Sequence, residues 1–194
     1  MSGPTVSALG DGEEPRAIDV LVTAFAADPV LRWMYPDATG YLAHFPAFLR
    51  AFGGQAFTSR SVWRLDGFEG VAMWFPPHVE PDGDAIVAEA TRSVGADRHA
   101  DLFAVLDQMD AAHPRFPHWY LPWFGVDAGR QGQGLGGVLL RQCLEMVDRD
   151  HLPAYLESPN PRNLTFYERH GFETIGTAQA GACPPLYGML RTAR

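Results

Sequence analysis

The spacing of apolar residues predicts most of the helices. From Ile18 to Phe25 apolar residues recur at the interval of one helical face, Pro15 suits the first turn, and Asp28-Pro29 ends the pattern. Comparable patterns predict helices over residues 41–52, 84–93 and 97–112, and a further helix that starts at Leu135. A short helix is expected at residues 163–169.

Strands are predicted where short runs of apolar, β-branched and aromatic residues lie between turn residues. Residues 61–65 and 71–75 flank Asp66-Gly67, a dipeptide that favours a tight turn, so they are expected to form a hairpin. Four more runs predict strands at residues 118–126, 154–157, 172–178 and 185–190.

The order of these elements predicts the fold class. An antiparallel hairpin comes first, and one strand–helix–strand crossover follows it after residue 118. Because a crossover pairs strands in parallel, the expected architecture is an α/β (α+β) sheet of mixed direction. We expect one domain over residues 15–194, after a flexible tail of small and polar residues at 1–14.

The composition limits the class of protein and its partners. Fifteen basic residues, all arginine, stand against 23 acidic ones, and the net charge of −8 disfavours a nucleic acid partner. Residues 1–15 contain neither a basic start nor an apolar run, so no signal or membrane anchor is expected there. Cys143 and Cys183 are expected to be reduced in a cytoplasmic protein. His113 and His118 precede a strand, but the histidines and cysteines lack the spacing of a metal site.

A glycine-rich turn follows the strand predicted at 118–126. It reads Gly132-Gln133-Gly134-Leu135-Gly136-Gly137 and opens into the helical pattern. The first amides of a helix have no partner within the helix and carry a partial positive charge, so a phosphate group is their natural ligand. The sequence therefore predicts a phosphate-binding loop between a strand and a helix.

Two classes of phosphate loop fit these glycines. Residues 132–137 match the Gly-x-Gly-x-x-Gly fingerprint of dinucleotide-binding proteins, and Glu157 follows the last glycine by twenty positions, where a ribose-binding acid is expected. However, five mostly polar residues separate Val126 from the first of these glycines, whereas the fingerprint starts almost directly after its strand. A Walker A loop is excluded, since the chain has no lysine.

Two motifs carry the other assignment. Gln131-Gly-Gln-Gly134-Leu-Gly136 is an instance of Arg/Gln-x-x-Gly-x-Gly/Ala, and Asn163 is followed by Tyr167 and by Gly171-Phe172. In this order and spacing they resemble the GNAT superfamily of N-acetyltransferases. Residues 124–172, together with residues 24–29 near the start, most closely resemble its puromycin N-acetyltransferase-like members. The resemblance is strong over roughly the last 80 residues and loose over the first 110. It implies a GNAT-type mixed, mostly antiparallel sheet with a central parallel strand splay, flanked by helices.

The resemblance also implies a cosubstrate, acetyl-coenzyme A. Its pantetheine arm would pair with the strand at residues 124–126, and its pyrophosphate would take the amides of residues 131–136. The residues implied to bind it are Phe124, Gly125, Val126, Gln131, Gly132, Gln133, Gly134, Leu135, Gly136 and Asn163. For Asn163, a helix cap is an alternative role that could coexist with this one.

Acetyl transfer requires a neutral amine, a polarised thioester carbonyl and a stabilised leaving thiolate. Backbone amides near Phe124 could polarise the carbonyl. Tyr167 matches the family tyrosine near the sulfur; with a reference pKa of about 10 against about 8.5 for a thiol, it would hydrogen-bond the sulfur and release its proton late. Glu157 is the candidate base for the amine proton. The alternatives are a core tyrosine and a solvated carboxylate at a strand end.

The acceptor is expected to bind to the first half of the chain. Asp28, Trp33, Tyr35 and Trp74 combine an acid with aromatic rings, which suits a cationic amine, although each could belong to the core. We therefore expect an acetyl-coenzyme A-dependent N-acetyltransferase that modifies a primary amine of a small molecule by direct attack in a ternary complex. A dinucleotide-binding protein and a non-catalytic coenzyme A-binding module are the alternatives, and the acceptor's identity and the oligomeric state stay open.

Overall fold

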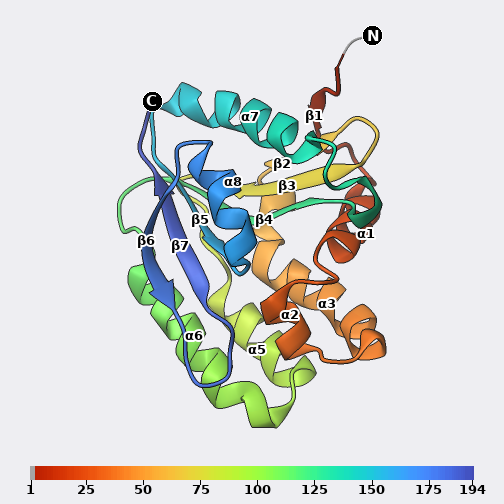
Figure 1. The fold of residues 1–194 in the computed structure, drawn as a ribbon, viewed down its shortest axis with the longest axis vertical. Helices are drawn as coiled ribbons and strands as arrows, with labels where there is room; N and C mark the ends of the chain where they lie inside the picture. The colour runs from red at the N-terminus through yellow and green to blue at the C-terminus, as the bar shows by residue number, and fades with distance from the viewer. Residues whose placement is uncertain (1–2) are drawn as a thin grey trace.

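A seven-stranded sheet forms the centre of the computed structural model, which describes residues 3–194 (Figure 1). The strands, in chain order, are β1 (Val6–Ala8), β2 (Val62–Leu65), β3 (Gly70–Phe75), β4 (Trp119–Val126), β5 (Ala154–Ser158), β6 (Glu173–Ala178) and β7 (Leu186–Arg191). Their order in the sheet is β1-β2-β3-β4-β5-β7-β6, and only β4 and β5 pair in parallel. The predicted mixed, mostly antiparallel sheet with a central parallel pair is confirmed.

Helices cover both faces of the sheet. One face carries α1 (Glu14–Ala24), α2 (Pro29–Met34), α3 (Ala38–Gly53), α4 (Gln55–Thr58), α5 (Gly83–Ser93) and α6 (His99–Ala112). The other face carries α7 (Leu135–Val147) and α8 (Leu164–Glu168). Four 3-10 turns, η1 (Ala96–Arg98), η2 (Ala128–Arg130), η3 (Asp148–Asp150) and η4 (Pro161–Asn163), complete the connections. Within residues 3–194 no helix has both the length and the apolar character needed to cross a bilayer.

The interior strand β3 contributes side chains to the hydrophobic cores on both faces of the sheet. Ala72 and Trp74 pack in the cluster under α7, whereas Val71, Met73 and Phe75 pack in the cluster under the helices of the first half. Successive side chains of a strand point to opposite faces, so a strand covered on both sides needs an unbroken apolar sequence. β3 meets this requirement, since all six of its residues are buried.

Three short helices and strands were not predicted: β1, α2 and α4. β1 forms inside the segment expected to be a flexible tail, where Val6 lies opposite Leu65 and its amide donates to the side chain of Gln142. A strand of three residues is too short to produce a periodic signal. α2 begins at Pro29, where the sequence predicts only the end of the preceding helix; Asp28 caps it. The domain therefore begins before residue 15.

The predicted hairpin is confirmed, but its turn differs from the expectation. The backbone in the left-handed region is that of Phe68, with a φ of 60°, and Gly67 does not adopt it. The ring of Phe68 lies under two guanidinium groups, at 4.0 Å from Arg16 and 4.6 Å from Arg64. These cation–π contacts stabilise a conformation that an aromatic residue seldom adopts.

Candidate active site

β4 and β5 separate soon after they begin to pair. Trp119 pairs with Ala154 and Tyr120 with Tyr155, and the parallel register ends there. β4 nevertheless continues to Val126 against β3. Its remaining backbone groups on the β5 side have no strand partner, so they are available to an extended ligand.

A bulge in β4 coincides with this separation. Met73 lies opposite Trp123 but Phe75 lies opposite Tyr120, so β4 has one residue more than β3 in this stretch. Pro122 lies within it and has no N–H to contribute to the sheet. The bulge therefore turns β4 away from β5 without leaving a backbone donor of that residue unpaired.

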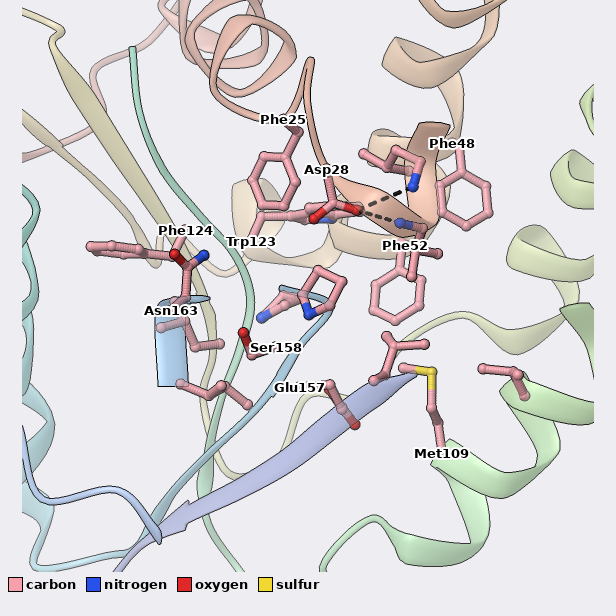
Figure 2. Close-up of a pocket in the computed structure, with 18 of the residues that line it drawn as sticks. Phe25, Asp28, Phe48, Phe52, Met109, Trp123, Phe124, Glu157, Ser158 and Asn163 are labelled. Carbon is pink, nitrogen blue, oxygen red and sulfur yellow. Dashed lines mark hydrogen bonds between the residues drawn. The ribbon is translucent and has the colours of Figure 1, made fainter. Parts of the chain in front are cut away.

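A cavity opens where the two strands separate (Figure 2). It has an empty volume of about 880 Å³ and is lined by β4, β5, α2, α3, α6 and α8. Most of its lining is apolar, and the polar or ionisable side chains are those of Asp28, Tyr120, Glu157, Ser158, Asn163 and Tyr167. An apolar pocket with a few convergent polar groups is the usual form of a small-molecule site.

Asp28 caps helix α2 and also lines the cavity. Its Oδ1 accepts hydrogen bonds from the amides of Val30 at 3.0 Å and Leu31 at 3.1 Å, as drawn in Figure 2. Both bonds end on one oxygen, which leaves Oδ2 for a ligand. Burial raises the pKa of this carboxyl from 3.8 to about 6, although the two amides act against the rise.

Tyr167 lies in the cavity wall on α8, 7% exposed. Its ring is held between Phe124, at 6.3 Å between centroids, and Phe172, at 6.0 Å. Burial, and next the charge of Asp28, raise the pKa of the hydroxyl above its ordinary value. Tyr167 therefore keeps its proton at neutral pH, and it can donate a hydrogen bond or act as an acid but cannot act as a base.

Glu157 points away from bulk solvent, with 6% of its side chain exposed. One carboxylate oxygen lies 3.8 Å from Nδ1 of His113. Burial and the Glu157 carboxylate together raise the pKa of Tyr120 and of Tyr155. The alternative of a solvated carboxylate at a strand end is therefore wrong, because Glu157 is the centre of a polar cluster.

The glycine loop has the backbone that a phosphate cradle requires. Gly132 and Gly134 have φ angles of 75° and 78°, and Gly134 precedes α7 without a side-chain cap. The first amides of α7 therefore receive no side-chain capping hydrogen bond from the N-cap residue. The side-chain amide of Gln131 donates to the carbonyl of Val126 at 3.0 Å, which ties the loop to the end of β4.

Of the other residues predicted to bind the cosubstrate, some can do so only through the backbone and others through the side chain. The side chain of Leu135 is buried under α7, so only its amide can face a ligand. Asn163 lines the cavity and makes no capping hydrogen bond to α8; the nearby cap is Asn160, whose side chain accepts from the amide of Arg162 at 3.0 Å. Asn163 therefore occupies the N-cap position of α8, but its side chain does not cap the helix and is available to a ligand in the cavity.

Three of the four predicted acceptor residues are not among those that line the cavity. Tyr35 donates to or accepts from Ser93 at 2.9 Å, and burial raises its pKa to about 12. Trp74 is fully buried beside α7, on the opposite face of the sheet. Trp33 packs against the core of the first half. These three side chains have packing roles, and only Asp28 of this group lies in the cavity.

Other residues line the site without having been predicted. Apolar side chains of the first half form much of the cavity wall, among them Phe25, Phe48, Phe52 and Met109. Arg141, Arg169 and Arg194 line a groove beside Gly134 and Gly137. The sequence has no signal that separates these apolar residues from core residues, or these arginines from other surface residues. Among residues 3–194 no group of three or more His, Cys, Asp or Glu side chains is placed to hold a metal.

Comparisons with known proteins agree with this geometry. Residues 82–174 match the family model of the acetyltransferase (GNAT) domain. A stretch of 76 residues is 39% identical to an uncharacterized N-acetyltransferase of Schizosaccharomyces pombe; it covers 38% of this chain but only 31% of that protein.

Solved structures share the fold over nearly the whole chain. A histone acetyltransferase HPA2 and related acetyltransferase of Corynebacterium glutamicum is 24% identical, with a TM-score of 0.70 over 100% of this chain and 98% of its own. The polyamine N-acetyltransferase of Drosophila melanogaster is 13% identical, with a TM-score of 0.66 over 98% of this chain and 100% of its own. The family match over residues 82–174 spans slightly less than half of the chain, and the solved structures share its fold, so we conclude that the chain has the fold of these acetyltransferases and is similar to the GNAT domain over residues 82–174.

Proposed function

We propose that the protein is an acetyl-coenzyme A-dependent N-acetyltransferase that modifies a primary amine of a small molecule. The observation that carries the proposal is the unpaired edge of β4, which runs from the glycine loop to a cavity lined by Asp28, Glu157 and Tyr167. A cosubstrate with phosphates at one end and an amide-containing arm that ends in a thioester fits such a path.

The residues along this path suit each part of the cosubstrate. The amides of residues 131–136 would hold the pyrophosphate, because two left-handed glycines bring them to the surface without side chains. The free edge of Phe124-Gly125-Val126 would pair with the amides of the pantetheine arm, and Asn163 would contact the same arm. Arginine side chains beside the loop add positive charge to an otherwise acidic protein.

Two polar residues of the cavity would carry out the two proton transfers of the reaction, one from the amine and one to the leaving sulfur. Bound acetyl-coenzyme A supplies an activated acyl thioester. Glu157 accepts a proton from the acceptor's ammonium group, so that a neutral amine can form the C–N bond by direct attack in a ternary complex. Tyr167 donates a hydrogen bond to the leaving sulfur and then its proton. Backbone amides of β4 near Phe124 would polarise the carbonyl.

A cationic amine is the acceptor class that this cavity favours. Asp28 offers a free carboxylate oxygen, and the wall around it contains Phe25, Phe48 and Trp123. An acid among aromatic rings attracts an ammonium group through charge and through cation–π contacts. The Drosophila neighbour is described as catalysing the formation of N-acetylagmatine, which agrees with this class. The puromycin N-acetyltransferase-like subgroup stays a prediction.

The two alternative functions differ in what they would bind. A dinucleotide-binding protein requires an extended parallel sheet, and a single parallel strand pair does not support it. A non-catalytic coenzyme A-binding module would bind the cosubstrate and leave amines unmodified.

Thermal unfolding with different ligands tests the cosubstrate. We expect acetyl-coenzyme A and coenzyme A to raise the Tm, since ligands that bind only the folded state stabilise it, and we expect NAD and NADP to leave it unchanged. A Tm that responds to a nicotinamide cofactor and to neither coenzyme A species would contradict the proposal. The Gly134→Ala variant, with its loop altered, supplies the matched control for specific binding.

A further inference from the structure

Glu157 lies where two cavities meet. The cavity at the β4–β5 separation and a second one, with an empty volume of about 1390 Å³, share Tyr120, Glu157 and three apolar side chains. The second cavity is bounded by α5, α6 and the two proline-rich segments before β4 and after β3, and His113 and His118 are part of its lining. A proton that Glu157 accepts in the first cavity can therefore leave through the second cavity.

The hydrogen bonds of the two histidines define which nitrogen carries each proton. Nδ1 of His118 lies 2.8 Å from the carbonyl oxygen of Phe116, and a carbonyl can only accept, so Nδ1 carries the hydrogen. Burial lowers the pKa of His118, so its imidazole is neutral and Nε2 is a lone pair. Nε2 of His113 lies 3.0 Å from that lone pair and must therefore donate.

In the neutral form of His113 this arrangement leaves Nδ1 as a proton acceptor that faces Glu157. The distance of 3.8 Å to the carboxylate is longer than a hydrogen bond, as expected for two atoms that both hold lone pairs. A proton on Glu157 would convert the contact into a donor and an acceptor. Aromatic rings fix the imidazole, since Tyr120 and Tyr155 lie edge-on to it at 4.8 and 4.9 Å between centroids.

The reaction under the proposed function releases one proton for each turnover. An ammonium group and a thioester give an amide, a free thiol and one H⁺: the C–N bond forms, the C–S bond breaks, and one of the two nitrogen protons ends on sulfur. We propose that His113 takes the remaining proton from Glu157 at Nδ1 and passes it to solvent in the second cavity, and that His118 is a positioning residue that holds His113 in the receptive tautomer. This inference rests on the proposed function.

The charged and titratable groups around the pair are compatible with this role. Tyr120 and Tyr155 stay protonated, because burial and the Glu157 carboxylate raise the pKa of both. Asp110 and Arg115 pair with each other at 3.0 Å near the cavity mouth. Glu80 and Asp107 line the same cavity and place acidic groups on the side to which the proton would leave.

Substitution of His113 tests the relay through its response to buffer. We expect His113→Gln to lower kcat roughly 10-fold to 100-fold with little change in the KM for acetyl-coenzyme A. In His113→Ala the rate should rise with the concentration of a small buffer that can carry the proton, such as phosphate, whereas the wild type and the exposed-site control His78→Gln should not respond. A kcat unchanged in His113→Gln, or a lowered kcat insensitive to buffer in His113→Ala, would overturn the relay.

The tautomers supply a test that needs no acceptor amine. Two-dimensional ¹⁵N–¹H NMR of the imidazole rings at neutral pH should find the hydrogen on Nδ1 in His118 and on Nε2 in His113. In His118→Phe the preference of His113 should be lost, and in His118→Gln, whose side-chain oxygen can still accept, it should be retained. A hydrogen on Nε2 of His118 would refute the relay. Absence of turnover by the wild-type protein with every amine would instead count against the proposed function.

Discussion

Tyr167 is the residue whose chemistry is most narrowly defined by its surroundings. Its buried ring is held by Phe124 and Phe172, and the pKa of its hydroxyl is raised, so the proton stays in place until a strong base forms beside it. A leaving thiolate is such a base. The same burial that keeps the proton in place makes Tyr167 a late donor, in agreement with the reference pKa values of tyrosine and thiol.

Removal of the Tyr167 hydroxyl should therefore affect turnover and spare binding. We expect Tyr167→Phe to lower kcat about 100-fold with a KM for acetyl-coenzyme A within about twofold of wild type, since the ring contacts remain. Steady-state kinetics checks this. Tyr35→Phe is the matched control, because Tyr35 bonds to Ser93 and is not among the residues that line the cavity. Equal kcat values in Tyr167→Phe and wild type would remove Tyr167 from the reaction.

Asp28 makes a prediction about stability and pH. The folded state binds the carboxyl proton more tightly than the unfolded state, because the pKa rises from 3.8 to about 6. The free energy of unfolding should therefore fall as the pH increases from about 4 to about 6, by up to roughly 3 kcal/mol. Asp28→Asn keeps a capping oxygen but carries no charge. Its stability relative to wild type should increase over this pH range in urea unfolding experiments, and a constant difference would contradict the assignment.

For single residues, the sequence predicted which ionisable side chains belong to the site, but it did not predict which aromatic side chains line the cavity and which lie in the core. Asp28, Glu157 and Tyr167 were predicted as site residues, and the structure brings all three to one cavity. Trp74 and Tyr35 were predicted from aromatic character, but a ring in a core and a ring in a pocket wall occupy the same periodic positions. Only the packing of distant segments separates the two cases.

The glycine loop is the element on which cosubstrate affinity should depend. Gly134 has a φ of 78° and open space around it, so an added Cβ would meet no atom but would strain the backbone. We expect Gly134→Ala to cost about 1 to 2 kcal/mol in stability and to weaken coenzyme A binding about tenfold. Isothermal titration calorimetry measures the affinity.

Gly176 supplies the control for this substitution. It lies on β6, also in open space, and its φ is outside the left-handed range, so Gly176→Ala should leave the Kd for coenzyme A unchanged. Similar losses of affinity in both variants, or no loss in Gly134→Ala, would show that the left-handed backbone of the loop is not required for binding.

Elements with several periodic turns or a strong turn signal were predicted, and so was the five-residue α8, which follows a Pro-Asn-Pro turn; β1, α2 and α4 were not predicted. α7 and the β2–β3 hairpin follow directly from their apolar spacing. β1 and α2 have three and six residues, too few to repeat a pattern. The bulge at Pro122 was also missed, because it depends on the register between β3 and β4, which no local pattern encodes.

At the scale of the whole molecule, the site is a product of topology. The cavity draws on residues from Phe25 to Leu186, and its two walls belong to helices of the first half and to strands of the second. The two sequence motifs specify the cosubstrate side, since they are local. The acceptor side depends on contacts between segments far apart in the chain. The first half of the sequence therefore predicted a class of acceptor but did not predict which residues line the pocket.

Acetyl transfer itself tests the central claim most directly. The purified protein would be incubated with acetyl-coenzyme A and a panel of amines that includes polyamines, arylalkylamines and puromycin, with thiol release followed by absorbance and the amine product by mass spectrometry. We predict that at least one cationic amine gains one acetyl group for each thiol released, and that Tyr167→Phe slows both signals equally. Thiol release no faster than hydrolysis with every amine, in a protein that binds acetyl-coenzyme A, would contradict the account and identify a binding module.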